Sequence, residues 1–341
     1  MPLTLPNPPA ENQSHSPRAA SKTGKTKTFP SQWSLARPDS AGPRRFGGRQ
    51  PVEAPRGLLL WHLASFDAPS VAAVWSLGFA WAAGVRLPLW VPVLLVLVVW
   101  PVYVGDRLLD ARACLQIAEG AAPAARNRLR ERHCFHWRHR RVLAPLAVTA
   151  ACAAAGIILA WMPDLARERD SFLAAASLAY FTGVHSGGRA RPFSVQALSG
   201  LLSKEFLVGL LFTAGCALPA FSASQHAALW PLFGVAGLYA ALAWLNCHAI
   251  DCWERRAHRS HRPPTPVSAA VVAIAAAGLT LYLSASCPRT AAMCAAAGLS
   301  ALLLALLDCA RGRIGPVTLR ASADLTLLTP VLLLPLRWLT R

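Results

Sequence analysis

Nine apolar stretches, separated by short polar segments, dominate the sequence and constrain how it can fold. They lie near residues 68–85, 88–105, 142–162, 171–185, 202–221, 228–250, 266–286, 290–308 and 321–336. A helix of roughly 20 apolar residues crosses a bilayer, and neighbouring helices accommodate prolines within such runs. Hydrophobic residues make up 54% of the chain and charged residues only 15%, against about a quarter in soluble domains. The sequence therefore predicts an all-α fold, a polytopic transmembrane helix bundle of about nine spans.

The basic residues are distributed unevenly between the two predicted sides of the membrane. The chain has 34 Lys and Arg against 16 Asp and Glu, a formal net charge of +18. Residues 1–56 are rich in Pro, Ser, Gly and basic residues, so we predict a disordered basic cytoplasmic tail there and a transmembrane helical domain over 57–341. With the N-terminus inside, most basic loop residues fall on the cytoplasmic side. We therefore expect an integral protein of a bacterial inner membrane with a cytoplasmic N-terminus. Because topology explains the charge, no nucleic-acid partner is expected.

Two aspartates mark the cytoplasmic end of the second apolar stretch. Asp106 and Asp110 are four residues apart, which places both carboxylates on one face of a helix. Two like charges there repel each other unless a cation lies between them. Mg²⁺ suits that position, because one or two carboxylates usually hold it while phosphate oxygens and water complete its coordination. The alternative is that the two aspartates pair with Arg107 and Arg112 at the membrane surface.

A second acidic cluster marks the cytoplasmic end of the sixth apolar stretch. Asp251 and Glu254 share a helical face, and Asn246 lies more than one turn earlier, within the apolar run. Polar side chains at that depth usually face the interior of a bundle or a cavity. The alternative is an ion pair between Asp251 and Arg255. On the predicted topology both acidic clusters lie at the same membrane face, beside basic loops. Carboxylates that hold Mg²⁺, with Arg and Lys around them, suit the binding of a diphosphate that is attached to an apolar chain.

In these features the chain resembles the UbiA superfamily of intramembrane prenyltransferases, over about residues 57–340. That resemblance implies that Mg²⁺ and the diphosphate of a prenyl donor are bound by two acidic motifs, and that a hydrophobic acceptor, aromatic or lipid-like, is alkylated among membrane lipids. It assigns Asp106, Asp110 and Asp251 as catalytic residues and metal ligands, and Glu254 as a further metal ligand. The expected substrate-binding residues are Tyr180, Arg189, Arg191 and Asn246. The chain differs from the family's motifs in having Val102 in place of an Asn, and Arg255 in place of a second Asp.

Other functions remain open on the sequence alone. The main alternative is a catalytically silent membrane protein of the same fold that acts in lipid binding, scaffolding or transport. A CDP-alcohol phosphotransferase fits less well because its characteristic Asp-x-x-Asp-Gly run is absent. The His- and Arg-rich segment 126–141 suits a basic amphipathic segment on the inner leaflet, a lid over the diphosphate or, less well, a zinc site. We expect Asp324 to pair with Arg320 one turn earlier, and Asp67 to cap a helix.

Overall fold

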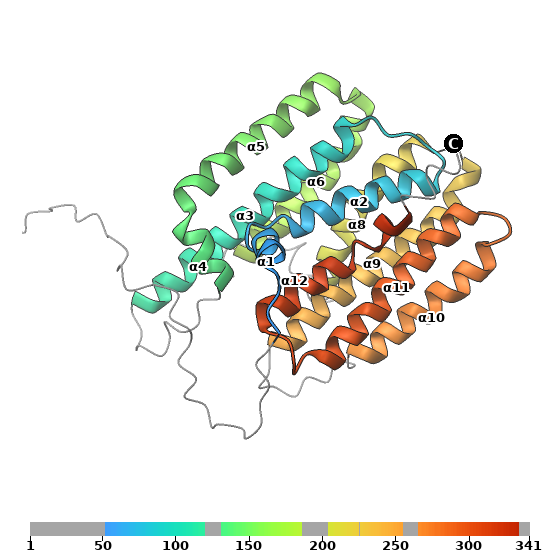
Figure 1. Cartoon of the computed structure of the whole chain (residues 1–341). Helices are drawn as coiled ribbons and strands as arrows, with labels where there is room; N and C mark the ends of the chain where they lie inside the picture. Colours follow the sequence, from blue (N-terminus) through green and yellow to red (C-terminus); the bar gives the residue numbers. More distant parts are fainter. Residues whose placement is uncertain (1–51, 120–130, 186–203, 225, 255–264, 334–341) are drawn as a thin grey trace, which may run out of the picture. The chain divides into compact units, whose positions relative to one another are not determined.

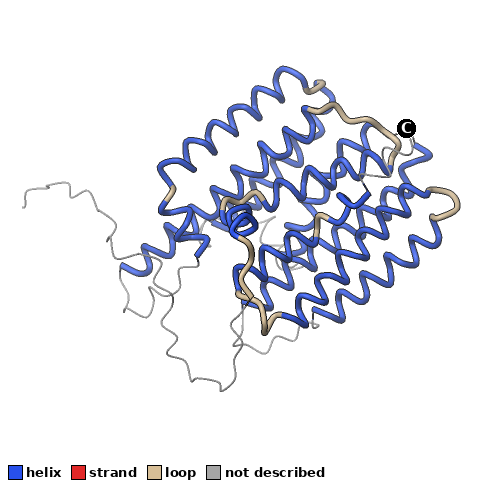
Figure 2. The backbone as a smooth tube through the Cα atoms, viewed as in Figure 1, coloured by secondary structure: helices blue, strands red, loops and turns tan. Residues whose placement is uncertain are grey.

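The computed structural model describes residues 52–119, 131–185, 204–224, 226–254 and 265–333, all within one compact unit that spans Arg49–Arg341. Figure 1 shows the helices in chain order, and Figure 2 shows that the described backbone is helical apart from short connections. An isolated bridge between Val52 and Ile314 is the one β-contact in these residues. The helices are α1 (Arg56–Leu63), α2 (Asp67–Ala82), α3 (Trp90–Glu119), α4 (Glu131–Arg138), α5 (Arg140–Trp161), α6 (Asp164–His185), α8 (Lys204–Ala223), α9 (His226–Glu254), α10 (Thr265–Leu283), α11 (Pro288–Ala310), α12 (Pro316–Thr326) and the 3₁₀ turn η2 (Thr329–Leu333).

Each of the nine predicted stretches overlaps a helix, but fewer helices are long and apolar enough to span a membrane. Six described helices meet that condition: α3, α5, α8, α9, α10 and α11. Together, α1 and α2 make a seventh if the pair is one broken span. Helix α6 begins with the charged sequence DLARERD, and α12 has only 11 residues, against about 20 for a full span. The described residues therefore hold six or seven candidate spans, and the prediction of nine is not confirmed.

Large apolar side chains cover the outside of the helices. Leu159 of α5, Phe172 of α6, Trp230 of α9 and Leu281 of α10 are each at least 70% exposed. Soluble proteins rarely expose apolar patches of this extent, whereas lipid tails solvate them. The protein is an integral membrane protein, and the all-α bundle predicted from the sequence is confirmed. Residues 1–51 lie outside the described part of the chain, so the predicted tail stays a prediction.

Helix α2 occupies a central place and contacts α3, α8, α9, α11 and α12. Its Trp75 and Phe79 are fully buried, one turn apart, and both contact Tyr239 of α9. The rings of Trp75 and Tyr239 stack with their centroids 3.9 Å apart, and Trp75 Nε1 donates a hydrogen bond to the Leu327 carbonyl at 2.8 Å. Each such aromatic pair contributes about 0.5–1.5 kcal/mol beyond area burial. The three residues thus join α2, α9 and the end of α12.

Helices α8 and α9 approach each other closely at Gly209. A Cβ atom on this residue would lie 3.0 Å from the backbone nitrogen of Trp244 and 3.3 Å from the carbonyl oxygen of Ala240. Small residues at such positions let two membrane helices pack backbone to backbone. The contact fixes the part of α9 that carries Asn246 and Cys247, two residues of the candidate site.

Candidate functional site

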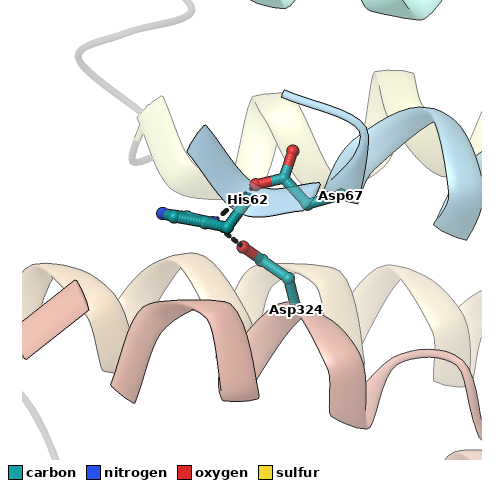
Figure 3. A group of neighbouring side chains, drawn as sticks. All are labelled: His62, Asp67 and Asp324. Atoms are coloured by element: carbon teal, nitrogen blue, oxygen red, sulfur yellow. Dashed lines mark ion pairs between the residues drawn. The ribbon is translucent and has the colours of Figure 1, made fainter. Parts of the chain in front are cut away.

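The chain turns sharply between α1 and α2, and this break carries the first residues of the candidate site. The two helices are bent by 88°. Ser65, in the break, has a φ of 61°, a left-handed conformation that is unfavourable for a residue with a Cβ atom. Pro69 fits the first turn of α2 because its missing N–H has no intrahelical partner there. The break brings His62, near the end of α1, against Asp67, the first residue of α2 (Figure 3).

His62, Asp67 and Asp324 form a buried cluster in which one imidazole nitrogen faces two carboxylates. His62 Nδ1 lies 2.8 Å from Asp67 Oδ2 and 3.3 Å from Asp324 Oδ2 of α12 (Figure 3). The side chains of His62 and Asp67 are each 3% exposed, and that of Asp324 is 17% exposed. Burying charges is costly unless they are paired. The cluster thus brings together polar side chains from α1, α2 and α12 at a buried position.

A chain of polar contacts joins this cluster to α3 and α4. The guanidinium of Arg107, from α3, has Nη2 3.8 Å from Asp67 Oδ2 and donates from Nε to Ser65 Oγ at 3.0 Å. Ser65 Oγ lies 3.2 Å from Nε2 of His136, whose Nδ1 lies 2.9 Å from the carbonyl oxygen of Arg132. Because that carbonyl only accepts, we assign the hydrogen to Nδ1 of His136, and Nε2 accepts from the Ser65 hydroxyl.

His136 is held in its neutral form by its surroundings. The residue is fully buried in α4, outside the candidate spans. Burial, together with the nearby guanidinium of Arg107, lowers the pKa of His136 to about 4, although the Arg132 carbonyl opposes the shift. A neutral imidazole is what the Ser65 contact requires. His136 thus lies on the face of α4 that packs against the protein, and the expectation of an amphipathic segment on the inner leaflet stays a prediction.

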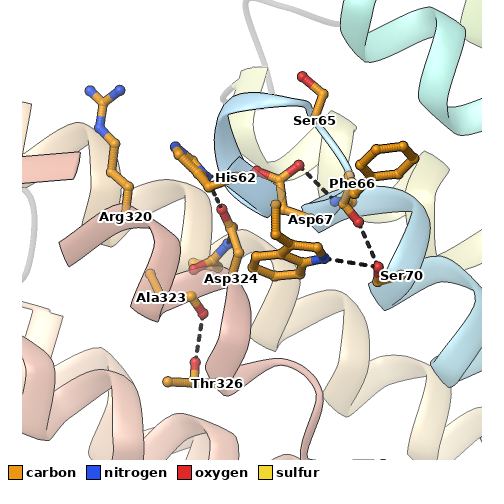
Figure 4. A network of polar contacts seen from close by, with 12 residues as sticks. His62, Ser65, Phe66, Asp67, Ser70, Arg320, Ala323, Asp324 and Thr326 are labelled. Atoms are coloured by element: carbon orange, nitrogen blue, oxygen red, sulfur yellow. Dashed lines mark hydrogen bonds and ion pairs between the residues drawn. The ribbon is translucent and has the colours of Figure 1, made fainter. Parts of the chain in front are cut away.

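Asp324 and Arg320 of α12 were expected to pair with each other, but each contacts a residue of another helix. Asn246 of α9 donates from Nδ2 to Asp324 Oδ1 at 3.0 Å. Arg320, one turn before Asp324, instead forms an ion pair with Glu254 at the end of α9, and Figure 4 shows its side chain directed away from Asp324. The predicted pair of Arg320 with Asp324 is therefore wrong. Each side chain finds a nearer partner on α1 or α9 than on its own helix.

The two predicted aspartates of α3 face different neighbours. Asp110 is 46% exposed and its Oδ2 lies 3.7 Å from Nε2 of His133 in α4. Asp106, one turn earlier, interacts electrostatically with Tyr180 of α6. Arg107, the residue suggested as an alternative partner of these aspartates, instead faces Asp67 and Ser65.

Tyr180 is the centre of a second polar neighbourhood, formed by four helices. Its hydroxyl interacts electrostatically with Cys247 of α9, Glu205 of α8 and Asp106 of α3. Glu205 is 6% exposed, whereas Asp106, Tyr180 and Cys247 are half-buried. Two of the predicted site residues, Asp106 and Tyr180, thus come together, and Asn246 precedes Cys247 on α9.

The remaining predicted site residues are less closely joined. Asp251 is half-buried in the last turn of α9, one turn before the end at which Glu254 pairs with Arg320. Arg189 and Arg191 lie outside the described residues, and so does Arg255, the alternative partner of Asp251. Over the described ranges, His62, Asp67 and Asp324 are the one group of three or more His, Cys or acidic residues whose ligand atoms all lie within 4.8 Å of one another.

The sequence analysis did not find the buried cluster as a unit. His62 precedes the first apolar stretch and carried no pattern, and Asp67 and Asp324 were interpreted as local helix partners. The available signal was that both aspartates adjoin or interrupt apolar stretches, where an unpaired charge is costly. No protein-family model matches the chain, and neither a curated protein nor a solved structure is significantly similar to it.

Proposed function

We propose that the protein is a membrane-embedded transferase that moves a prenyl group from a prenyl diphosphate to a hydrophobic acceptor in the presence of Mg²⁺. The observation that carries the proposal is the electrostatic interaction of Tyr180 with Asp106, Glu205 and Cys247, which come from three other helices of an apolar bundle. Acidic side chains enclosed by membrane helices are rare and mark functional sites. The proposal includes a divergent UbiA-like ancestry, nine spans with a cytoplasmic N-terminus, and a bacterial inner membrane.

Within this proposal the residues divide into those that hold the diphosphate and those that shape the site. Asp106, Asp110 and Asp251 supply carboxylate oxygens, the donors that Mg²⁺ prefers. Glu254 fits less well, because Arg320 already neutralises it. Bound Mg²⁺ would offset the negative charge that develops on the leaving pyrophosphate. Arg189 and Arg191 are proposed to contact that diphosphate, and Tyr180 and Asn246 to line its path.

The proposed reaction is an alkyl transfer. The bond between the allylic carbon and the diphosphate oxygen breaks, and its electron pair leaves with pyrophosphate. The resulting allylic cation takes an electron pair from the acceptor, which then loses a proton. The apolar walls of the bundle keep water from the cation, which would otherwise be hydrolysed.

A silent membrane protein of the same fold is the second candidate, and one observation favours it. Two of the four proposed metal ligands already contact cationic or potentially cationic partners, Glu254 with Arg320 and Asp110 with His133. In this alternative the acidic residues stabilise the bundle, which acts in lipid binding, scaffolding or transport.

Release of pyrophosphate distinguishes the two candidates. Membranes that contain the wild-type protein are incubated with labelled geranyl, farnesyl or geranylgeranyl diphosphate and Mg²⁺, beside membranes without the protein. The matched control variant is Asp164→Asn, since the Asp164 side chain is 94% exposed at the start of α6. We expect wild type and Asp164→Asn to release pyrophosphate, and Asp106→Asn to be slower by about 100-fold or more. Equal release from all membranes, or an unchanged rate in Asp106→Asn, overturns the proposal.

A further inference from the structure

We propose that His62, Asp67 and Asp324 bind a divalent first-row transition-metal ion that fastens the break between α1 and α2 to α12. Its ligands are not the acidic residues assigned to the prenyl donor, although Asn246, proposed to line the path of the diphosphate, contacts Asp324. One imidazole nitrogen and two carboxylate oxygens form a mixed donor set, which suits Zn²⁺, Mn²⁺, Fe²⁺ or Co²⁺ better than Mg²⁺ or Ca²⁺, whose usual ligands are all oxygen.

The three donor atoms lie close enough together to share such an ion. Ligands at about 2.0–2.1 Å from a four-coordinate Zn²⁺ lie about 3.3 Å from one another. His62 Nδ1 lies 2.8 Å from Asp67 Oδ2 and 3.3 Å from Asp324 Oδ2. All three ligand atoms lie within 4.8 Å of one another, and Figure 3 shows them directed toward one another from three helices.

The other oxygen of each carboxylate is already held by a hydrogen bond. Asp67 Oδ1 accepts from the backbone N–H of Ala68 at 2.9 Å, and Asp324 Oδ1 accepts from Nδ2 of Asn246 at 3.0 Å. Both Oδ2 atoms are thereby oriented toward His62. Outer contacts of this kind orient the ligands of protein metal sites.

Two buried polar atoms in this group make no hydrogen bond within the described part of the chain. One is His62 Nδ1, despite its closeness to both carboxylates, and the other is the amide oxygen Oδ1 of Asn246. Both residues are more than nine-tenths buried, where a polar atom without a hydrogen bond is costly. A metal ion would use the lone pair of Nδ1.

A proton on His62 is the competing occupant of the same place. Arg107 compensates one of the two carboxylate charges from 3.8 Å, so a protonated imidazole would make the group neutral, whereas a divalent ion on a neutral imidazole would give it one net positive charge. A single N–H group at Nδ1 serves one carboxylate fully at a time, although Nδ1 lies within ion-pair distance of both. A metal ion, in contrast, satisfies both carboxylates at once. We therefore favour the metal, and treat a buried proton alone as the outcome that overturns the proposal.

The test is Co²⁺ binding to the purified, metal-free, full-length protein in detergent. We expect one equivalent of Co²⁺ to bind with a d–d absorption band, to be displaced by Zn²⁺ but not by Mg²⁺, and to show no thiolate charge-transfer band from the cysteines. Asp324→Asn should weaken binding by about 100-fold or more. His139→Gln, at an exposed histidine between α4 and α5, should bind as wild type does.

A second variant keeps the test decisive if Asp324→Asn fails to fold. His62→Cys replaces the imidazole with a thiolate donor, so Co²⁺ at this site should gain a thiolate charge-transfer band that wild type lacks. A wild-type protein that binds no Co²⁺ holds a buried proton only, and overturns the proposal. Equal binding by Asp324→Asn, or a His62→Cys spectrum without the new band, also overturns it, because the ion then binds elsewhere.

Discussion

Two aspartate–histidine contacts in this protein differ in the exposure of the aspartate and in the distance between the partners. Asp67 and His62 are each 3% exposed, with 2.8 Å between Oδ2 and Nδ1. Asp110 is 46% exposed and His133 only 6% exposed, with 3.7 Å between Oδ2 and Nε2, so solvent reaches this pair from the aspartate side. Removing one partner of a buried ion pair costs about 3–5 kcal/mol, whereas an exposed pair contributes about 0–1 kcal/mol. The same residue pair is therefore expected to support the fold strongly in one place and only weakly in the other.

The largest expected effect on the free energy of unfolding is at the buried contact between Asp67 and His62. Asp67→Asn removes a charge that faces both His62 and Arg107, and Arg107 is only 7% exposed. The guanidinium is then left buried without its carboxylate, so we expect the free energy of unfolding to fall by about 3–5 kcal/mol. Denaturant unfolding of the detergent-solubilised protein, followed by tryptophan fluorescence, measures it. A loss below about 1 kcal/mol would show that the two contacts do not differ.

We expect the free energy of unfolding to depend on pH through His136. Its pKa is lowered from 6.5 to about 4 on folding, so between these values the unfolded chain binds more protons than the folded one. The stabilisation is fully present above about pH 6.5 and is lost as the pH falls through about 4. We expect up to about 3 kcal/mol of difference. His136→Gln, which cannot be protonated, should remove that part of the pH dependence; identical pH profiles for the two proteins would contradict the assignment.

The smallest expected effect on stability is at the exposed contact. Asp110→Asn should change the free energy of unfolding by less than about 1 kcal/mol, because solvent screens its interaction with His133. The measurement is the same denaturant titration used for Asp67→Asn. A loss comparable to that of the buried variant would mean that Asp110 supports the fold rather than a reaction.

The sequence predicted the helices better than it predicted their partners. Long apolar stretches place α3, α5 and α9 to α11 because a buried or lipid-exposed backbone must satisfy its own hydrogen bonds. Side-chain partners depend on which helices pack together, which no local spacing encodes. Arg320 and Asp324 show this: their i, i+4 spacing favours a pair, yet the two side chains turn to Glu254 and His62.

The candidate site was partly predictable for the same reason. Asp106 and Tyr180 were found because a charge or hydroxyl at the end of an apolar run stands out, and they do come together. His62 lies in a short helix of eight residues before the first apolar stretch, so its burial follows only from the 88° break at Ser65. Ser65, in that break, contacts Arg107 and His136, from two other helices.

The central claim is that α3, α6, α8 and α9 enclose a site for chemistry that is distinct from the buried residues that hold the fold. The most direct test is Mg²⁺-dependent release of pyrophosphate by Asp106→Asn, expressed per amount of folded protein and compared with wild type in the same membranes. We predict a wild-type folded fraction and a rate lower by about 100-fold or more. A rate per folded protein equal to that of wild type would contradict the claim.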